Sequence, residues 1–359
     1  NQKKSWHISC NYLIKYLTEM LKNNKIISED INHILETDLP WKDFKNKVIL
    51  ITGGNGFIAS YMLKALLKAN TRYKLNLKLI SIIRKESKSN LKDPLLEVIK
   101  EDLCDLNIQK IPKADIIIHA ASIASPCFFE KEAVDIIKTN TLATIKLLEI
   151  AKKISEKFLY ISSGEVYGEI ENYNSEIEEN YYGKINHLNK RSVYAESKKI
   201  GELICNSYSS SKKLKVFIAR PFHTYGPGIK LNDGRVFADF VNAVVNKKDI
   251  ILKSKGNSKR PFCYISDAII ALFTILLKGS NSNAYNIANP NCEIKIKDLA
   301  LVLSNIIPEK RVNIKFSNEK SMSNPLIRQK VSIDKMKNLN WMPRVGINEG
   351  FTKTIKYFL

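Results

Sequence analysis

A glycine-rich turn between a short apolar run and a helical pattern constrains the fold of this chain most strongly. Residues 48–51 have the composition of a strand buried on both faces, and the next segment reads Thr52-Gly53-Gly54-Asn55-Gly56-Phe57-Ile58-Ala59. Glycines let the backbone approach a pyrophosphate, and the N-terminus of the following helix offers unpaired N–H groups and the positive end of its dipole. The spacing is G-x-x-G-x-x-A rather than G-x-G-x-x-G, and its place between strand and helix predicts a dinucleotide-binding turn.

Beyond that turn the pattern alternates between strands and helices. Apolar runs predict six strands, and helical spacing predicts helices between several of them; the strands are 48–51, 77–83, 97–99, 115–119, 158–162 and 216–219, and the helices 57–69, 133–154 and 194–208. Such alternation predicts an α/β fold, a Rossmann-type doubly wound parallel sheet with helices on both faces. We expect residues 47–220, with 262–280 returning to them, to form this NAD(P)-binding domain.

The rest of the chain is assigned to two further units. Residues 221–359, with 169–190 contributing, interrupt the alternation and hold more Pro, Gly and Asn, so we expect a smaller, mainly substrate-binding lobe there. Residues 1–46 contain apolar residues at helical spacing and a capped short helix that starts at Ser28. They predict a helical N-terminal extension that packs on the main body.

Composition bears on the class of protein. An apolar fraction of 44% excludes a disordered or collagen-like chain, and the apolar stretches stop near ten residues, about half of what a membrane span needs. The net charge of +21 raises the question of nucleic-acid binding. The excess is mostly Lys spread along the chain, so we interpret it as a solvated surface and expect no nucleic-acid partner. Six scattered cysteines without zinc spacing predict a reducing, cytoplasmic location and no metal site.

The end of the second predicted strand bears on the choice of dinucleotide. An acidic side chain there would accept a hydrogen bond from the ribose 2′-hydroxyl of NAD, but the sequence reads Ile83-Arg84-Lys85-Glu86-Ser87. Two cations and a hydroxyl suit a 2′-phosphate, which favours NADP over NAD. The alternative is that Arg84 and Lys85 belong to the general cationic excess.

A Tyr–Lys pair predicts the catalytic group. Tyr194 and Lys198 lie at i and i+4, so they share one face of the predicted helix. An ammonium beside a phenol favours the phenolate and lowers the tyrosine pKa toward working pH. The spacing alone is common in a Lys-rich chain. It gains weight because segment 159–168, some 30 residues earlier, ends a central strand, where ligands bind in open α/β sheets.

Taken together, the motifs resemble the extended short-chain dehydrogenase/reductases, and more narrowly their nucleotide-sugar epimerase/dehydratase branch. The resemblance covers about residues 47–350. It consists, in the family's order, of the glycine turn, Asp102-Leu103, His119-Ala120-Ala121-Ser122, Asn140, Ser162-Ser163-x-Glu165-x-Tyr167-Gly168, Tyr194-x-x-x-Lys198 and Arg220-Pro221-x-x-x-Tyr225-Gly226-Pro227. Residues 1–46 lie outside it.

The resemblance implies a role for each matching residue. Tyr194 would be the general base and acid on a sugar hydroxyl, Lys198 would tune it and hold the nicotinamide ribose, and Ser163 would bind the reacting oxygen. Asn140 would brace the active-site helix. The implied cofactor-binding residues are Thr52, Gly53, Asn55, Gly56, Phe57, Ile58, Arg84, Lys85, Asp102, Leu103, Ala120, Ala121, Ser122, Asn140, Pro221 and His223. Arg260 would grip the nucleotide diphosphate, with Arg235 and Ser162 as further substrate-binding candidates.

The reaction depends on two neighbouring residues. By resemblance, Glu165 stands where sugar 4,6-dehydratases and nucleotide-glucuronate decarboxylases carry a glutamate, whereas Gly164 removes the acid that glucose-type dehydratases place beside it. We therefore expect a UDP-glucuronate decarboxylase-like or 4,6-dehydratase/epimerase-like enzyme that makes surface polysaccharide precursors, as a homodimer. The alternatives are an NADPH-dependent reductase of a nucleotide-linked keto sugar or ketose, and a non-catalytic NAD(P)-binding regulatory or scaffold protein.

Overall fold

The computed structural model describes residues 25–84, 93–107, 109, 111–170, 176–210, 214–317 and 330–359. Within these residues a seven-stranded sheet has the order β11-β6-β5-β4-β1-β2-β3, and every neighbouring pair is parallel. The strands are β1 Val48–Thr52, β2 Lys78–Ile83, β3 Leu96–Lys100, β4 Ile116–His119, β5 Lys157–Ile161, β6 Lys215–Pro221 and β11 Asn283–Ile287. The predicted Rossmann-type sheet is confirmed. The seventh strand, β11, was not predicted.

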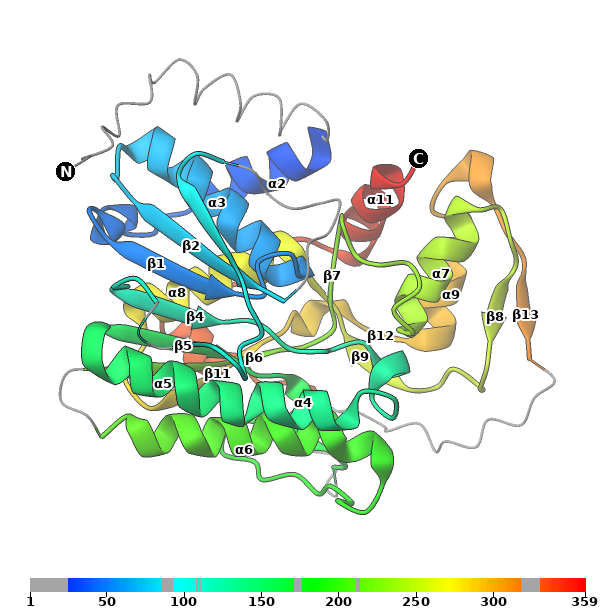
Figure 1. Ribbon diagram of the computed structural model, residues 1–359. Coiled ribbons are helices and arrows are strands. Elements are labelled where there is room, and N and C mark those ends of the chain that lie inside the picture. The colour runs from blue at the N-terminus through cyan, green and yellow to red at the C-terminus, as the bar shows by residue number, and fades with distance from the viewer. Residues whose placement is uncertain are drawn as a thin grey trace.

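Helices cover both faces of this sheet (Figure 1). Helices α3 (Phe57–Tyr73) and α8 (Ile265–Lys278) lie on one face, and α5 (Leu142–Ile154) and α6 (Val193–Tyr208) lie on the other. Within β1, Ile49 and Ile51 belong to the apolar core under α3 and α8, whereas Leu50 belongs to the core under α5 and α6. Successive side chains of a strand point to opposite faces, which is why a run of apolar residues builds both cores.

The single helix predicted over residues 133–154 is wrong in one respect, because it is two helices. Helix α4 (Ala133–Asn140) ends where α5 begins, and Thr141 between them has φ −119° and ψ −70°. The break directly follows Asn140, which is fully buried and hydrogen-bonded to Ser122 and Ser197. A polar residue turned into the interior therefore interrupts a segment whose apolar spacing alone indicates continuity.

The remaining elements lie mostly to one side of the sheet, where Figure 1 shows α7, α9, β8 and β13 grouped. In the described residues of this part there are three pairs of short strands and four helices. The strand pairs are β7 (Thr224–Tyr225) with β10 (Cys263–Tyr264), β8 (Ile250–Leu252) with β13 (Ile314–Phe316), and β9 (Lys259–Pro261) with β12 (Glu293–Lys295). The helices are α7 (Val236–Val245), α9 (Ile296–Asn305), α10 (Asp334–Lys337) and α11 (Ile347–Tyr357). The domain boundaries given above stay predictions. Among the described residues no helix has the length and apolarity to cross a bilayer.

The part of the N-terminal extension that the structure describes packs on the main body. Helix α2 (Lys25–Leu35) contacts α3 and α8, and Ile31 and Ile34 are fully buried there. The helical pattern at residues 11–24 lies outside the described residues. Asp30, only 2% exposed, accepts hydrogen bonds from Tyr264 (2.9 Å) and Tyr61 (3.3 Å), and Lys353 lies 3.9 Å away. One carboxylate thus joins α2 to three other parts of the fold.

Asp30 should make stability depend on pH. Burial raises the pKa of this carboxyl from 3.8 to about 6, so the folded state binds a proton that the unfolded state releases between about pH 4 and 6. The free energy of unfolding should therefore fall by roughly 3 kcal/mol as pH rises through that window. In Asp30→Asn this slope should vanish, and the variant should be at least as stable as the wild type at pH 8. Urea unfolding at several pH values checks this; an unchanged slope would contradict it.

Candidate active site

The turn after β1 has the geometry that a pyrophosphate cradle needs. Gly53 has φ +71°, and a Cβ there would lie 2.8 Å from the Cα of Ala121. Both the left-handed backbone and the close approach exclude larger side chains. Thr52 is fully buried, and its hydroxyl accepts a hydrogen bond from the Ala121 N–H (3.1 Å) and lies 2.8 Å from Nδ1 of His119. The turn is thereby tied to the end of β4.

The first turn of α3 is open to an anion. Gly56 is the N-cap of this helix and makes no side-chain cap, and a Cβ there would meet only the carbonyl oxygen of Gly53. Phe57 and Ile58 are half-buried in the first helical turn, and Asn55 is exposed beside it. Amide groups at such a helix end suit a phosphate. The residues present therefore fit the dinucleotide that the sequence predicts.

The residues expected at the adenosine end lie next to this turn. Arg84, at the end of β2, pairs with Asp135 (3.3 Å) and Glu132 (3.9 Å), and its side chain is 43% exposed. Lys85 lies outside the described residues. Asp102 accepts a hydrogen bond from the N–H of Cys104 (2.8 Å), and Leu103 is buried. Arg84 is thus occupied by carboxylates in this structure.

A chain of hydrogen bonds connects the strip after β4 to the active-site helix. Ala120, Ala121 and Ser122 are half-buried after β4. Ser122 donates to Oδ1 of Asn140 (2.9 Å), Asn140 donates to Ser197 (2.9 Å), and Ser197 donates to the carbonyl of Tyr194 (3.0 Å). This is a bracing arrangement of the kind expected for Asn140.

Tyr194 lies near the start of α6 in a mainly apolar pocket. It is 7% exposed, and its ring stacks on Phe129 with centroids 4.9 Å apart and planes 10° apart. Burial raises the pKa of Tyr194 to about 12, while Arg235 and a hydrogen bond with Ser163 lower it and Glu165 raises it. The structure therefore brings together Tyr194, Ser163, Glu165 and Arg235, which come from three separate stretches of the sequence.

Lys198 lies near Tyr194, but its expected effect on the pKa of that tyrosine is absent from the structure. It is 1% exposed, and its ammonium donates to the carbonyl of Ile161 (2.7 Å), 5.9 Å from the ring centroid of Tyr194. Burial lowers the pKa of Lys198 to about 7. The cation that lowers the pKa of Tyr194 here is Arg235, and the net shift is upward. The predicted lowering of the tyrosine pKa by Lys198 is thus not what this structure shows.

The packing of the segment after β5 explains why position 164 is a glycine. Ser163 caps the short helix Gly164–Tyr167 by accepting from the N–H of Glu165 (3.1 Å), and both side chains are half-buried. A Cβ at Gly164 would lie 2.5 Å from the ring of Phe222, which is 1% exposed. An acidic side chain does not fit beside Glu165 while that ring is in place.

The other expected residues are distributed around this centre. Pro221 is the last residue of β6. His223 follows the strand with φ +33°, and its ring centroid lies 5.7 Å from that of Phe262. Arg235 caps α7, donates to the carbonyl of Ala124 (3.2 Å) and pairs with Asp233 (3.5 Å). Arg260 is half-buried in β9. Ser162 is 3% exposed and donates to Glu202 (2.5 Å), so its hydroxyl points into the protein.

Sequence reasoning missed Phe129, Phe222 and Glu202. The two aromatic rings carry no local signal, because their partners are distant in sequence. Glu202 could have been found, since it follows Lys198 by four residues and so shares its helix face.

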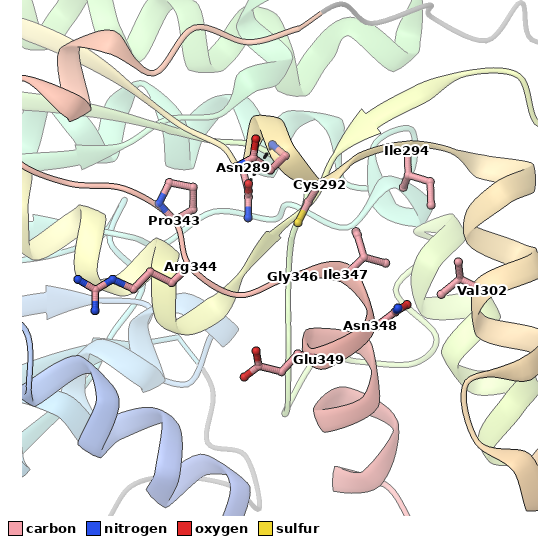
Figure 2. Close-up of a pocket in the computed structure, with 11 residues that line it drawn as sticks. Asn289, Cys292, Ile294, Val302, Pro343, Arg344, Gly346, Ile347, Asn348 and Glu349 are labelled. Carbon is pink, nitrogen blue, oxygen red and sulfur yellow. Dashed lines mark hydrogen bonds between the residues drawn. The ribbon is translucent and has the colours of Figure 1, made fainter.

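A cavity of about 420 Å³ lies elsewhere, between the segment after β11, α9 and the start of α11 (Figure 2). Asn289, Cys292 and Glu349 are among its lining residues, and none of the expected site residues that the structure describes lines it. Among the described residues, no cluster of three His, Cys, Asp or Glu side chains could hold a metal ion. We therefore place the candidate active site at Tyr194, not at this cavity.

The chain is similar in sequence to known proteins. The model of the NAD dependent epimerase/dehydratase family matches residues 49–288. UDP-glucuronic acid decarboxylase 3 of Arabidopsis thaliana is 33% identical over 310 residues, which are 85% of this chain and 87% of that protein.

Solved structures show the same fold. A UDP-N-acetylglucosamine 4-epimerase from Methanobrevibacter ruminantium M1, in complex with UDP-N-acetylmuramic acid, superposes with a TM-score of 0.75 at 26% identity, covering 88% of this chain and 98% of that one. A UDP-glucuronic acid 4-epimerase from Bacillus cereus, in complex with UDP-glucuronic acid and NAD, has a TM-score of 0.74 at 24% identity, covering 87% and 98%.

Proposed function

Because the chain belongs to the NAD-dependent epimerase/dehydratase family, a family of nucleotide-sugar-modifying enzymes, we propose that it decarboxylates UDP-glucuronic acid. The observation that carries this proposal is the packing of Phe222 on Gly164. It keeps Glu165 beside Tyr194 but leaves no room for an acid at position 164. Loss of water from a sugar needs such an acid for the leaving hydroxyl, whereas loss of carbon dioxide does not. The similarity to a plant UDP-glucuronic acid decarboxylase supports the same choice.

The residues that would hold the dinucleotide follow from the site. Gly53 and Gly56 would lie against the pyrophosphate at the N-terminus of α3, and Asp102 and Leu103 would border the adenine. Ala120 and Ala121 would line the middle of the cofactor, and Lys198 would reach the nicotinamide ribose. When bound, NAD supplies the acceptor for the hydride from C4 of the sugar and its donor at the end of the cycle.

The chain's own chemistry begins at Tyr194. Its phenolic oxygen would take the proton of the sugar 4-hydroxyl as that carbon is oxidised to a ketone, and Ser163 would hold the same oxygen. The hydrogen bond between Ser163 and Tyr194 supports this assignment, since it brings the two side chains together. Arg235 would favour the phenolate, since its charge already lowers the pKa of Tyr194.

Oxidation at C4 makes the substrate a β-keto acid, and such acids lose carbon dioxide readily. The bond between C5 and the carboxyl carbon breaks, its electron pair moves into an enolate, and C5 must then gain a proton. We assign that proton transfer to Glu165, which lies close enough to Tyr194 for its charge to raise the pKa of that phenol. Arg260, in β9, would bind the diphosphate as a fixed fork of donors.

The experiment that tests this function is a mass-spectrometric screen of nucleotide sugars with NAD and NADP, each supplied in its oxidised and in its reduced form. The proposal expects UDP-glucuronic acid to lose carbon dioxide. Loss of water, gain of two hydrogens or an unchanged mass would instead mark a dehydratase, a reductase or an epimerase.

The preference for NADP over NAD stays a prediction that rests on Arg84 and Lys85. In the structure a 2′-phosphate would compete with Asp135 and Glu132 for Arg84. Arg84→Ala should weaken NADP binding about fivefold and leave NAD binding unchanged, because only NADP presents the phosphate. Asp135→Asn, which releases Arg84, should strengthen NADP binding. Calorimetric titration of both cofactors checks this, and equal changes for NAD and NADP would rule the preference out.

We also propose that the enzyme is a homodimer, paired through α4, α5 and α6. Large apolar side chains are exposed on these helices: Val134, Ile137, Leu142, Ile145, Ile200 and Leu203, with exposed fractions of 37–66%. Such a patch is typical of an interface.

Leu203→Glu should weaken the dimer at least about tenfold in sedimentation equilibrium. Leu301→Glu, at an equally exposed leucine on α9, is the control and should leave it intact; a Leu203→Glu protein that stays dimeric would refute this interface.

A further inference from the structure

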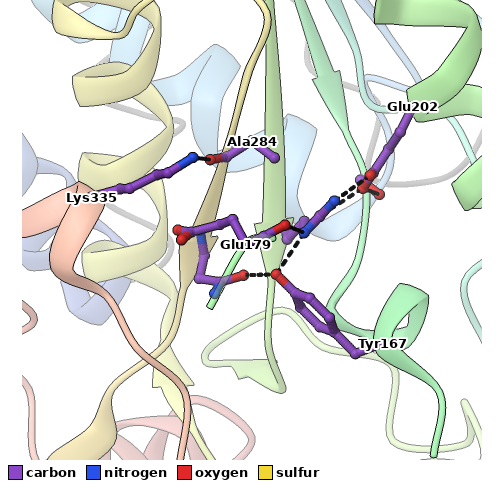
Figure 3. A network of polar contacts seen from close by, with 8 residues as sticks. Tyr167, Glu179, Glu202, Ala284 and Lys335 are labelled. Carbon is purple, nitrogen blue, oxygen red and sulfur yellow. Dashed lines mark hydrogen bonds and ion pairs between the residues drawn. The ribbon is translucent and has the colours of Figure 1, made fainter. Parts of the chain in front are cut away.

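A buried ion pair lies behind the active site (Figure 3). The guanidinium of Arg220, in β6, binds both carboxylate oxygens of Glu202, in α6, at 2.9 and 2.6 Å. Their side chains are only 12% and 10% exposed. Neither Arg220 nor Glu202 has a role in the proposed reaction.

The pair is the centre of a larger network. Glu202 also accepts from the hydroxyl of Ser162 (2.5 Å), and Arg220 also donates to the hydroxyl of Tyr167 (2.6 Å) and to the carbonyl of Glu179 (2.9 Å). Tyr167 in turn donates to Oδ1 of Asn286 in β11 (2.6 Å).

Three members of this network, Ser162, Tyr167 and Glu202, lie close in sequence to residues of the site. Ser162 immediately precedes Ser163, and Tyr167 ends the short helix that carries Glu165. Glu202 lies one helical turn after Lys198 and two after Tyr194. Moving either charged residue would therefore move the segment that carries Ser163 and Glu165 relative to the helix that carries Tyr194.

A buried ion pair of this kind is better suited to fixing the positions of neighbouring residues than to stabilising the fold. Removing two charges from water costs several kcal/mol per ion, and well-packed apolar residues often stabilise a fold equally well. What an apolar pair cannot do is set the distance and direction of three neighbours, Ser162, Tyr167 and Glu179, through directional hydrogen bonds. The bidentate contact between Arg220 and Glu202 does this with two rigid planar groups.

We propose that Glu202 and Arg220 are positioning residues, which hold Ser163 and Glu165 at the working distance from Tyr194 through Ser162 and Tyr167. Ser162 then serves the reaction through its neighbour and not by touching the substrate. This inference rests on the proposed function for the reaction it serves. Because Arg220 also donates to the carbonyl of Glu179, the same network holds the segment around Glu179 against Tyr167.

The test compares two buried serines. Ser162→Ala removes one link to Glu202, and Ser155→Ala removes a hydrogen bond of similar burial, from Ser155 to the carbonyl of Ala114 (2.7 Å), before β5 starts. Ser162→Ala should lower kcat for UDP-glucuronic acid about tenfold with an unchanged KM, whereas Ser155→Ala should change neither. Glu202→Gln keeps an acceptor for Ser162, so it should retain more turnover than Glu202→Ala.

Amide hydrogen exchange gives a readout that needs no turnover. In Ser162→Ala the amides of Glu165 and Gly168 should exchange about tenfold faster, while those of α3 should not change. Equal kcat in Ser162→Ala and Ser155→Ala, or exchange that rises uniformly over the chain, would overturn the inference. A wild type that turns over no UDP-glucuronic acid would instead overturn the proposed function, and local exchange would still decide on the network.

Discussion

Replacing Tyr194 by phenylalanine should lower turnover by about a hundredfold to ten-thousandfold and leave cofactor binding intact. In the proposed mechanism the phenolic oxygen takes the proton of the sugar hydroxyl, and the variant lacks only that oxygen. The ring itself should stay in place, since it stacks on Phe129 in a buried pocket. Steady-state kinetics with UDP-glucuronic acid measures the loss, and calorimetric titration measures the cofactor affinity.

Phe129→Leu is the matched control for this experiment. It removes the stacked ring but keeps the phenol of Tyr194, so it should cost far less turnover than Tyr194→Phe. If Tyr194→Phe retains wild-type turnover, the catalytic assignment of Tyr194 is wrong. If it loses turnover and cofactor binding together, Tyr194 contributes to the binding site and not to proton transfer.

Replacing Glu165 by glutamine should separate two steps of the reaction. The amide has nearly the same shape, yet it cannot deliver a proton to C5, so formation of the decarboxylated sugar should fall about a hundredfold. Oxidation at C4 depends on Tyr194 and Ser163 and should continue. Reduced cofactor should therefore accumulate in a single turnover, which its near-ultraviolet absorbance reveals.

Glu169→Gln serves as the control, because Glu169 is exposed a few residues later in the same segment. Its turnover should equal that of the wild type. Unchanged product formation in Glu165→Gln would remove the proton-transfer role of Glu165. Loss of both oxidation and product formation would mean that Glu165 orders the site as a whole.

The central fold was predictable because most strands of its sheet, such as β1 and β2, are buried on both faces. Residues 48–51 and 77–83 are short apolar runs, and such runs identify parallel strands whatever their tertiary partners. Strand β11 escaped prediction because it contains Asn283 and Asn286, and Asn286 is buried only through its hydrogen bonds to other segments. A strand held by such contacts carries no local pattern.

The candidate site likewise has features that the sequence predicts and features that only the tertiary structure reveals. The glycine turn and the Tyr194–Lys198 spacing are local patterns, and the structure places both at the carboxyl edge of the sheet. The ring of Phe222 on Gly164 and the charge of Arg235 acting on Tyr194 are tertiary contacts between distant segments. They could not be predicted from spacing, and they shape the choice of reaction.

The most direct test of the proposed function uses UDP-glucuronic acid that is isotopically labelled in its carboxyl group. Incubated with the enzyme and NAD, the substrate should release labelled carbon dioxide at the same rate as it yields an unlabelled UDP-pentose. Gly164 and Glu165 lead to this expectation, because we assign Glu165 as the proton donor for C5, and the packing of Phe222 leaves no room for an acid at position 164. A product that keeps the labelled carboxyl group would contradict the account.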